Sequence, residues 1–129
     1  MTLKEFFDRP EKWTQGVLAR GRNNESVSCY GSAGTCFCLE GGIRRLVMKS
    51  SKTFPRLFDV TEAYERQIPA WMELRGRQGP AGQVLRTLIN FNDKILQSYE
   101  DLMDFLTFAE DQLGPDTPQF DIPQQENPL

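Results

Sequence analysis

The segment from Gly34 to Lys49 constrains the fold more than any other part of the chain. It ends with positive charge, which is favourable at the C-terminal end of a helix because the helix dipole is negative there. We therefore predict a central buried helix over this segment. Glycine in a helix interior costs on the order of 1 kcal/mol relative to alanine, so the Gly41-Gly42 pair is expected to lie close to a neighbouring element. The apolar residues of the segment are Cys36, Cys38, Leu39, Ile43, Leu46 and Val47.

Three further helices are predicted from caps and periodicity. Thr2 and Glu5 have the spacing of a capping box, which predicts a short helix over residues 3–8. An apolar stripe predicts a helix over 83–91, and Ser98 is placed to cap a last amphipathic helix. The stripe consists of Val84, Leu85, Leu88 and Ile89, and the last helix has Tyr99, Leu102, Met103, Leu106 and Ala109 at spacings of three and four.

The remaining segments carry weaker signals. Residues 13–20 and 26–30 are predicted to form a β-hairpin with a turn at 21–25, where glycine and asparagine gather. Helix is the competing interpretation for 13–20, because this apolar run is too short for periodicity to decide. Residues 50–82 are predicted to be irregular, apart from a helical turn or two at 61–67, because prolines and glycines interrupt them.

The fold class that follows is mainly α, with a small β-hairpin. The 129 residues, 39% of them apolar, suit a single core. One compact domain is predicted over residues 1–113. From Gly114 onward, four of sixteen residues are proline and three are acidic, so residues 114–129 are predicted to form a flexible acidic tail.

Charge is segregated along the chain. All fifteen lysines and arginines lie at or before Lys94, and fifteen basic against ten acidic residues give residues 1–94 a net charge of +5. Residues 95–129 carry eight carboxylates and no basic residue. This split favours attraction to a charged partner. The candidate partner-binding residues are therefore the basic Arg44, Arg45 and Lys49, together with Trp71 and Met72 as apolar anchors, for which core packing is an equal alternative.

Neither a membrane segment nor a metal site is expected. The first residues do not form an export signal, and no stretch approaches the roughly 18 apolar residues that span a bilayer, so a cytoplasmic protein is predicted. A structural zinc needs four ligands, and the chain has three cysteines and no histidine. No cofactor is predicted, and cysteine–histidine catalysis is excluded within the chain. Cys29, Cys36 and Cys38 are expected to be free and buried, although a helix start could activate a thiol.

Three short motifs are spaced along the chain. They are Trp13-Thr-Gln15-Gly16, then Cys36-Phe-Cys38-Leu-Glu-Gly41-Gly42-Ile, then Leu88-Ile-Asn-Phe91-Asn92-Asp93. In this order they resemble a family of small bacterial and phage proteins of unknown function, with W-x-Q-G, W-C-x-x-G-A and W-N-D motifs. The chain departs from the pattern at Phe37, Gly42 and Phe91. The resemblance implies a compact, mostly helical fold and supplies no activity.

The polar motif residues allow two interpretations. Asn90, Asn92 and Asp93 could form a polar binding site together with Gln15. We favour the alternative, in which the asparagines and the aspartate end a helix and begin a turn by bonding to nearby backbone groups, and Gln15 satisfies buried amides of that turn. Gly31-Ser-Ala-Gly34 is typical of an anion-binding helix start, but it lacks the lysine of a phosphate loop.

Together these features predict a small non-enzymatic protein-binding domain, adaptor-like or inhibitor-like and phage-related, and they predict no oligomeric state. The first alternative is a nucleic-acid-binding module, regulated by the acidic tail, although a pI near 5.0 counts against it. The second alternative is a thiol-dependent sensor. The basic face of the nucleic-acid alternative adds Arg20, Arg22, Lys52 and Arg56, interleaved with Phe54 and Phe58.

Overall fold

The computed structural model describes residues 1–50, 57–83 and 85–122. It confirms the predicted fold class, because the chain is mainly helical with a small antiparallel pair of strands. The α-helices are α1 (Leu3–Phe6), α2 (Leu39–Lys49), α3 (Leu57–Glu65), α4 (Ile68–Arg75), α5 (Leu88–Lys94) and α6 (Tyr99–Leu113). The strands are β1 (Ala19–Arg20) and β2 (Cys36–Phe37), and the 3-10 helices are η1 (Pro10–Lys12), η2 (Pro80–Gly82) and η3 (Gly114–Asp116).

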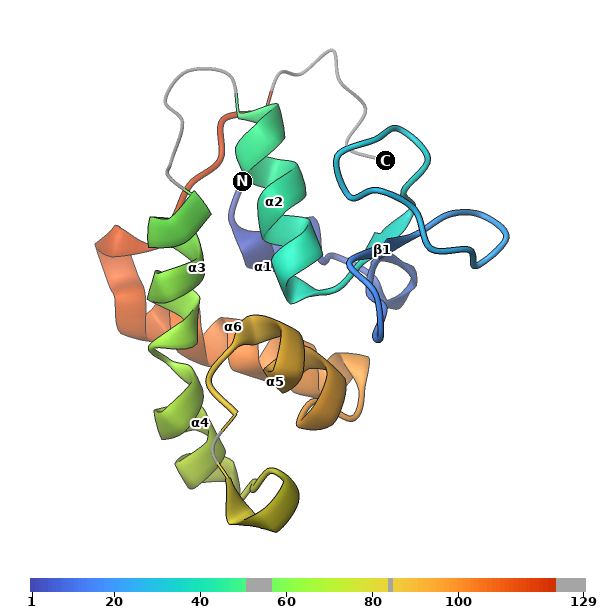
Figure 1. Ribbon diagram of the computed structural model, residues 1–129. Coiled ribbons are helices and arrows are strands. Elements are labelled where there is room, and N and C mark those ends of the chain that lie inside the picture. The colour runs from blue at the N-terminus through green and yellow to red at the C-terminus, as the bar shows by residue number, and fades with distance from the viewer. Residues whose placement is uncertain (51–56, 84, 123–129) are drawn as a thin grey trace.

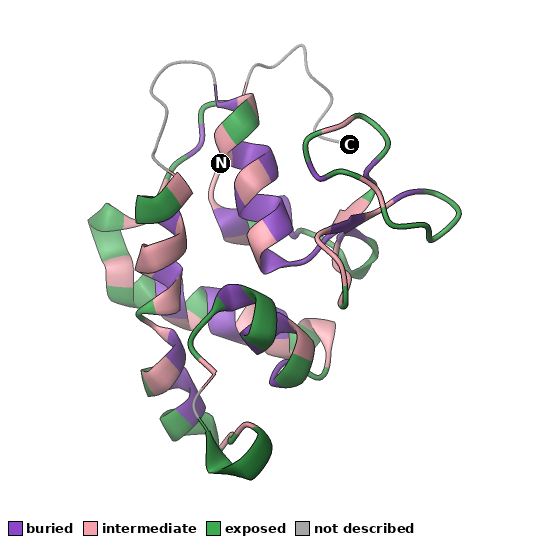
Figure 2. Cartoon of the chain, in the orientation of Figure 1, coloured by how far each residue is buried: buried purple, intermediate pink, exposed green. Residues whose placement is uncertain are grey.

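The helices enclose one core. Figure 1 shows α3 and α4 along one side of the molecule, while β1 and the loops around it lie on the opposite side. Helix α2 packs against α3 and α5, and α6 packs against α1 and α4. The buried faces of these helices point inward, and the loops beside β1 are largely exposed (Figure 2). None of the described helices has both the length and the apolarity that a bilayer crossing requires.

Aromatic side chains fill the core in two groups. Trp71 meets the rings of Phe91 and Phe105 edge to face, with centroid distances of 5.5 and 5.9 Å. Phe6 contacts Phe7 and Phe37, with centroid distances of 5.0 and 5.4 Å. Such pairs add stability beyond the area that they bury. The first group ties α4, α5 and α6 together, and the second joins α1 to β2.

The caps predicted for the first and last helices are present in the structure. Thr2 and Glu5 form the predicted capping box of α1, although the helix ends at Phe6 rather than at residue 8. The Ser98 hydroxyl accepts a hydrogen bond from the Asp101 amide at the start of α6, which confirms the predicted cap. Helix α6 buries the stripe Leu102, Phe105, Leu106 and Ala109.

The central helix is shorter than predicted. Helix α2 begins at Leu39, because Cys36 and Phe37 are extended in β2 and the Cys38 sulfur caps the helix by accepting from the Gly41 amide. The expected close approach of the glycine pair is present. A Cβ on Gly41 would lie 2.0 Å from the Leu18 carbonyl oxygen, and one on Gly42 would lie 2.8 Å from the Phe7 ring.

The strand pairing differs from the predicted hairpin. β1 pairs with β2, in the register Ala19 to Phe37, and not with a strand over 26–30. The turn at 21–25 does form, since the Gly21 amide donates to the Glu25 carbonyl over 2.9 Å, and a single bridge joins Arg20 to Ser26. Residues 13–20 are not helical, which rules out the competing interpretation.

Two predictions for the middle of the chain were wrong. Residues 57–75, expected to be mostly irregular, form α3 and α4, and Pro69 lies in the first turn of α4, where its missing amide costs no hydrogen bond. The helix expected over 83–91 begins at Leu88, where the Thr87 hydroxyl accepts from the Asn90 amide, and it continues to Lys94. Val84 and residues 51–56, with Lys52, Phe54 and Arg56, lie outside the described residues.

The first part of the predicted tail belongs to the domain. Phe120 is 2% exposed in the core, and Ile122 packs against it. The terminal amine of Met1 donates to the Phe120 carbonyl over 3.0 Å, and the Phe120 amide donates to the Met1 carbonyl over 2.8 Å. The domain therefore extends past the predicted boundary at 113 to at least Ile122. The rest of the predicted tail, 123–129, is not among the described residues.

Candidate functional site

Asn92 joins the three sequence motifs at a buried polar centre. Its Oδ1 accepts hydrogen bonds from Trp13 Nε1 over 2.7 Å and from the Leu39 amide over 3.2 Å. Its Nδ2 donates to the Thr14 carbonyl over 3.1 Å and to Asp93 Oδ1 over 2.9 Å. These four bonds occupy both donors and both lone pairs of the amide. Asn92 therefore holds the first motif, the start of α2 and α5 in one arrangement.

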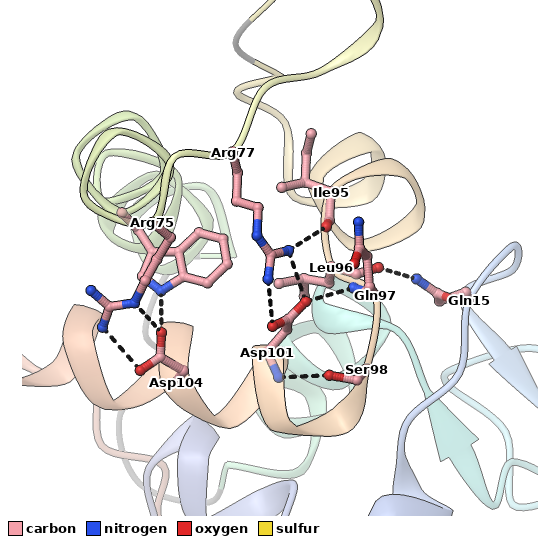
Figure 3. A network of polar contacts seen from close by, with 10 residues as sticks. Gln15, Arg75, Arg77, Ile95, Leu96, Gln97, Ser98, Asp101 and Asp104 are labelled. Carbon is pink, nitrogen blue, oxygen red and sulfur yellow. Dashed lines mark hydrogen bonds and ion pairs between the residues drawn. The ribbon is translucent and has the colours of Figure 1, made fainter.

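Gln15 and Gly16 complete this centre, which we call the motif junction: Trp13, Gln15, Gly16, Asn92 and Asp93. Gln15 Nε2 donates to the carbonyls of Asn92 and Leu96 over 2.7 and 2.8 Å, and the second of these bonds is visible in Figure 3. The Gly16 amide donates to Asp93 Oδ1 over 2.9 Å. Asn92 and Asp93 lie inside α5 and do not terminate it, while Gln15 satisfies the carbonyls at its end. The polar motif residues thus bond mainly to backbone groups, but these groups are far away in sequence. The helix end that the favoured interpretation placed at Asn92 and Asp93 is not found there.

A small cleft opens beside the motif junction. We call it the docking cleft; its volume is about 160 Å³. All three motifs contribute to its lining, because Gly16, Cys38 and Asp93 come from the three different motifs. Ile89 is 40% exposed at the cleft, Val17 and Leu18 are half-buried, and Cys38 is buried. The docking cleft is lined by Gly16, Val17, Leu18, Cys38, Ile89 and Asp93.

Cys29 and Cys38 lack the environment of reactive thiols. Burial raises the pKa of the Cys38 thiol to about 11, and this outweighs the favourable hydrogen bond from the Gly41 amide at the helix start. Burial also raises the pKa of Cys29. Cys36 is half-buried. Little thiolate is therefore present at Cys29 and Cys38 at neutral pH. Within the described part of the chain, no group of three potential ligands could hold a metal ion.

Trp71 and Met72 lie in the core and cannot serve as exposed anchors for a partner. Trp71 is 0% exposed, and its indole Nε1 donates to Asp104 Oδ2 over 2.8 Å. Both residues belong to α4, which the sequence did not predict and which packs this face against α6. Of the two interpretations of these residues, the structure supports core packing.

Three of the candidate basic residues that the structure describes, Arg20, Arg44 and Arg45, are engaged in contacts within the chain. Arg45 is 6% exposed and its guanidinium donates to the carbonyls of Cys29 and Gly31, so it fastens a loop to α2. Arg44 pairs with Glu40 one turn earlier, and Lys49 is half-buried near the end of the helix. Arg20 is also committed, because its guanidinium bonds to the Thr14 hydroxyl and to two backbone carbonyls. The basic face that nucleic-acid binding requires is therefore smaller than the sequence suggested.

Two ion pairs to α6, one from the end of α4 and one from the residues that follow it, were not predicted from the sequence (Figure 3). Arg75 Nε lies 2.7 Å from Asp104 Oδ2, and Arg77 Nη2 lies 2.9 Å from Asp101 Oδ1. The hydrogen bonds from Arg77 and Arg75 lower the pKa of Asp101 and of Asp104, respectively. Part of the acidic end is thus neutralised within the molecule. No spacing rule could have found these pairs while α4 itself was interpreted as irregular.

Comparison with protein-family models, with curated proteins and with solved structures finds no match to this chain. The resemblance of the three motifs to a family of bacterial and phage proteins stays a prediction. Function is therefore inferred from the motif junction and the docking cleft themselves.

Proposed function

We propose that this chain is a non-enzymatic protein-binding domain of the cytoplasm, adaptor-like or inhibitor-like and of phage-related type, which receives a partner at the docking cleft. The observation that carries the proposal is the convergence of three distant motifs on one cleft with a partly exposed apolar rim. Val17, Leu18 and Ile89 supply that rim. A cleft of about 160 Å³ is the size of one side chain rather than of a metabolite, for which pockets of roughly 300 Å³ or more are usual.

The walls of the cleft are held in place before any partner arrives. The Cys38 amide donates to the Leu18 carbonyl over 3.1 Å, and Asp93 Oδ1 holds the Gly16 amide. Asn92 fixes α5 against the start of α2 through the hydrogen bond that its Oδ1 accepts from the Leu39 amide. Preorganisation of this kind favours affinity, because little conformational entropy is lost on binding.

The lining defines the chemistry of the partner. An apolar side chain would enter between Val17, Leu18 and Ile89, and the Asp93 carboxylate at the same cleft favours a basic group beside it. Burial of an apolar anchor in a pocket is the usual centre of a binding interface, and complementary charge at the edge adds specificity. We therefore expect an exposed partner segment with an apolar residue next to a lysine or arginine.

Capture from native lysate with matched variants tests this proposal. Ile89→Glu places a charge at the cleft, whereas Leu74→Glu makes the same change at an exposed leucine of α4 outside it. The unmodified protein and the Leu74→Glu variant should retain the same stoichiometric partner at low salt. The Ile89→Glu variant should lose it while keeping its melting temperature, because Ile89 is already partly exposed.

Recovery of monomer alone from all three proteins would count against the proposal. So would a partner that binds all three equally, because that result would place the interface elsewhere on the molecule.

A further inference from the structure

The backbone of Val17 is unpaired at the wall of the docking cleft, although both of its neighbours are bonded. On one side the Gly16 amide donates to Asp93 Oδ1 over 2.9 Å, and on the other the Leu18 carbonyl accepts from the Cys38 amide over 3.1 Å. The Val17 amide and carbonyl form no hydrogen bond with any residue in the described part of the chain. Val17 lines the cleft and is half-buried, so water satisfies these two groups when no partner is bound.

The loop that carries Val17 is braced from within. The Arg20 guanidinium donates to the Thr14 hydroxyl and to the Gln15 carbonyl, each over 3.0 Å. Gly16 is exposed and places no side chain over the amide that follows it. The unpaired donor and acceptor of Val17 are therefore held in place at the cleft by the bonds of the residues around them.

A partner that covers the docking cleft has to replace the water at Val17. A peptide group that is buried without a hydrogen bond costs free energy that offsets the gain from burying an apolar anchor. The partner must therefore present an acceptor to the Val17 amide and a donor to its carbonyl. One residue of an extended segment supplies both groups on the same side, as in a β-sheet. An α-helix does not, because its backbone groups are already bonded within the helix.

The size of the cleft and the position of Asp93 also suit an extended segment. A cleft of about 160 Å³ takes one side chain, whereas a docked helix uses a row of anchors at spacings of three and four. Asp93 Oδ1 accepts from the Gly16 amide and from Asn92 Nδ2, while Oδ2 accepts from no group among the described residues. This second oxygen is therefore available to a lysine or arginine of the partner.

From these contacts we infer that the docking cleft binds an extended segment of its partner protein, which forms two main-chain hydrogen bonds with Val17. The inference rests on the proposed function and adds the conformation of the bound segment. One apolar side chain enters the cleft. Because alternate side chains of an extended chain share a face, the lysine or arginine that meets Asp93 lies two positions from this anchor.

Selection from two displayed libraries tests the conformation of the bound segment. One library consists of linear random decapeptides, and the other randomises the exposed face of a helix in a three-helix bundle. Binders are kept only if they bind the unmodified protein and not the Ile89→Glu variant, which restricts them to the cleft. The linear library should yield binders with an apolar residue two positions from a lysine or arginine, and the helical library should yield none.

The outcomes separate this inference from the proposed function. Helical binders at the cleft, alone or with affinity equal to that of the linear ones, would overturn the inference and leave the cleft as a protein-binding site. Linear binders with their apolar and basic residues three or four positions apart would overturn it too, because that is the spacing of a helix face. If neither library gave binders that depend on Ile89, the docking cleft itself would be contradicted, and the inference with it.

A change to the backbone at Val17 tests the hydrogen bond directly. Replacement of Val17 by α-hydroxyvaline turns its amide into an ester, which removes the donor and keeps the side chain. The selected linear peptides should bind this protein about tenfold more weakly, the loss expected for one interfacial hydrogen bond. The matched control is the same change at Ser26, an exposed residue outside the cleft whose amide is likewise unpaired among the described residues.

The Ser26 ester should bind the linear peptides as the unmodified protein does, and both esters should keep its melting temperature. Undiminished affinity of the Val17 ester would overturn the inference. So would a lowered melting temperature for the Val17 ester alone, because it would show that this amide is already bonded within the fold.

Discussion

Single residues at the motif junction are specified by hydrogen-bond chemistry. Asn92 is fully buried, and it needs two donors toward Thr14 and Asp93 and two lone pairs toward Trp13 and Leu39. An amide is the only neutral side chain of this size with both capacities. Aspartate has the same shape but lacks the donors, so it would face the Thr14 carbonyl and the Asp93 carboxylate with an unprotonated oxygen.

Asn92→Asp is therefore expected to destabilise the domain by about 3 kcal/mol, because it buries a charge against two acceptors. Urea unfolding followed by circular dichroism measures the loss. Asn90→Asp, two residues earlier on the exposed side of α5, is the matched control and should change stability little. Equal effects of the two variants would show that Asn92 does not hold the junction.

At the scale of elements, the first turn of α2 is defined by its contact with the chain before β1. Gly41 lies against the backbone of Leu18, which cannot move without breaking its hydrogen bond to Cys38. Gly42 faces the ring of Phe7, which has some freedom to shift. The two glycines therefore differ in what they tolerate, although helix propensity favours alanine at both positions.

Gly41→Ala should lower stability by on the order of 3 kcal/mol or more, because its Cβ would overlap a fixed carbonyl oxygen. Gly42→Ala should cost less, and Gly42→Leu roughly 1–3 kcal/mol or more. Thermal melts rank the three variants, with Met48→Ala on the exposed side of α2 as the control. Unchanged or raised midpoints for all three would mean that the glycine pair does not mark a packed contact.

The contact between Arg77, which follows α4, and Asp101 of α6 should depend on pH. The pKa of Asp101 is lowered in the folded protein by Arg77, so the pair stabilises the fold above the unfolded carboxyl pKa of about 4. This contribution is lost as pH falls through the lower folded pKa. Asp101→Asn should thus reduce the melting temperature at neutral pH, and its difference from the unmodified protein should close in acid.

Asp111→Asn is the control on the same helix, because Asp111 is exposed. It should leave the melting temperature almost unchanged at every pH. A deficit for Asp101→Asn that persists unchanged in acid would contradict an ion-pair origin.

Elements with local signals could be predicted from the sequence, and elements defined by distant partners could not. Thr2 and Ser98 mark their helices through caps within three residues, so α1 and α6 were found. The segment at Ala19 does contact the predicted partner through the bridge from Arg20 to Ser26, but its strand pairing is with β2, which was not predicted because Phe37 lies beyond a long loop. Helix α4 was not predicted because a proline usually interrupts a helix. Pro69 is compatible with this helix only because it lies in the first turn, and the sequence did not show where the helix begins.

At the scale of the whole molecule, the two ends of the described chain close one core. Met1 and Phe120 are joined by two backbone hydrogen bonds, and the Asp121 amide donates to the Ser50 hydroxyl over 3.3 Å. The charge split does not produce a separate tail over residues 114–122. The packing of residues 114–122 could not be predicted from their acidic composition, because Phe120 and Ile122 are the only large apolar residues among them.

Phe120→Ala should therefore destabilise the domain by about 3–5 kcal/mol, the usual cost of removing a buried phenylalanine. Denaturant unfolding provides the value, and Gln119→Ala at the exposed neighbouring position is the control. If Phe120→Ala were as stable as this control, the domain would end near residue 113, as composition suggests.

Some residues of the candidate site could be identified from the sequence, and others could not. Gln15, Gly16, Asn92 and Asp93 were singled out from their motifs, and the structure brings them together. Val17, Leu18 and Ile89 were not, because an apolar residue next to a motif carries no sign that the fold will leave it exposed.

Site-specific photo-crosslinking at Val17 is the sharpest test of whether the docking cleft binds a protein partner. A benzophenone side chain placed there lies at the rim of the docking cleft, and the same group at Leu74 lies on exposed α4 outside it. Irradiation in native lysate should give one discrete covalent adduct from position 17 and none from position 74. An adduct from position 74 alone, or none from position 17, would contradict the assignment of the docking cleft as the protein-binding site.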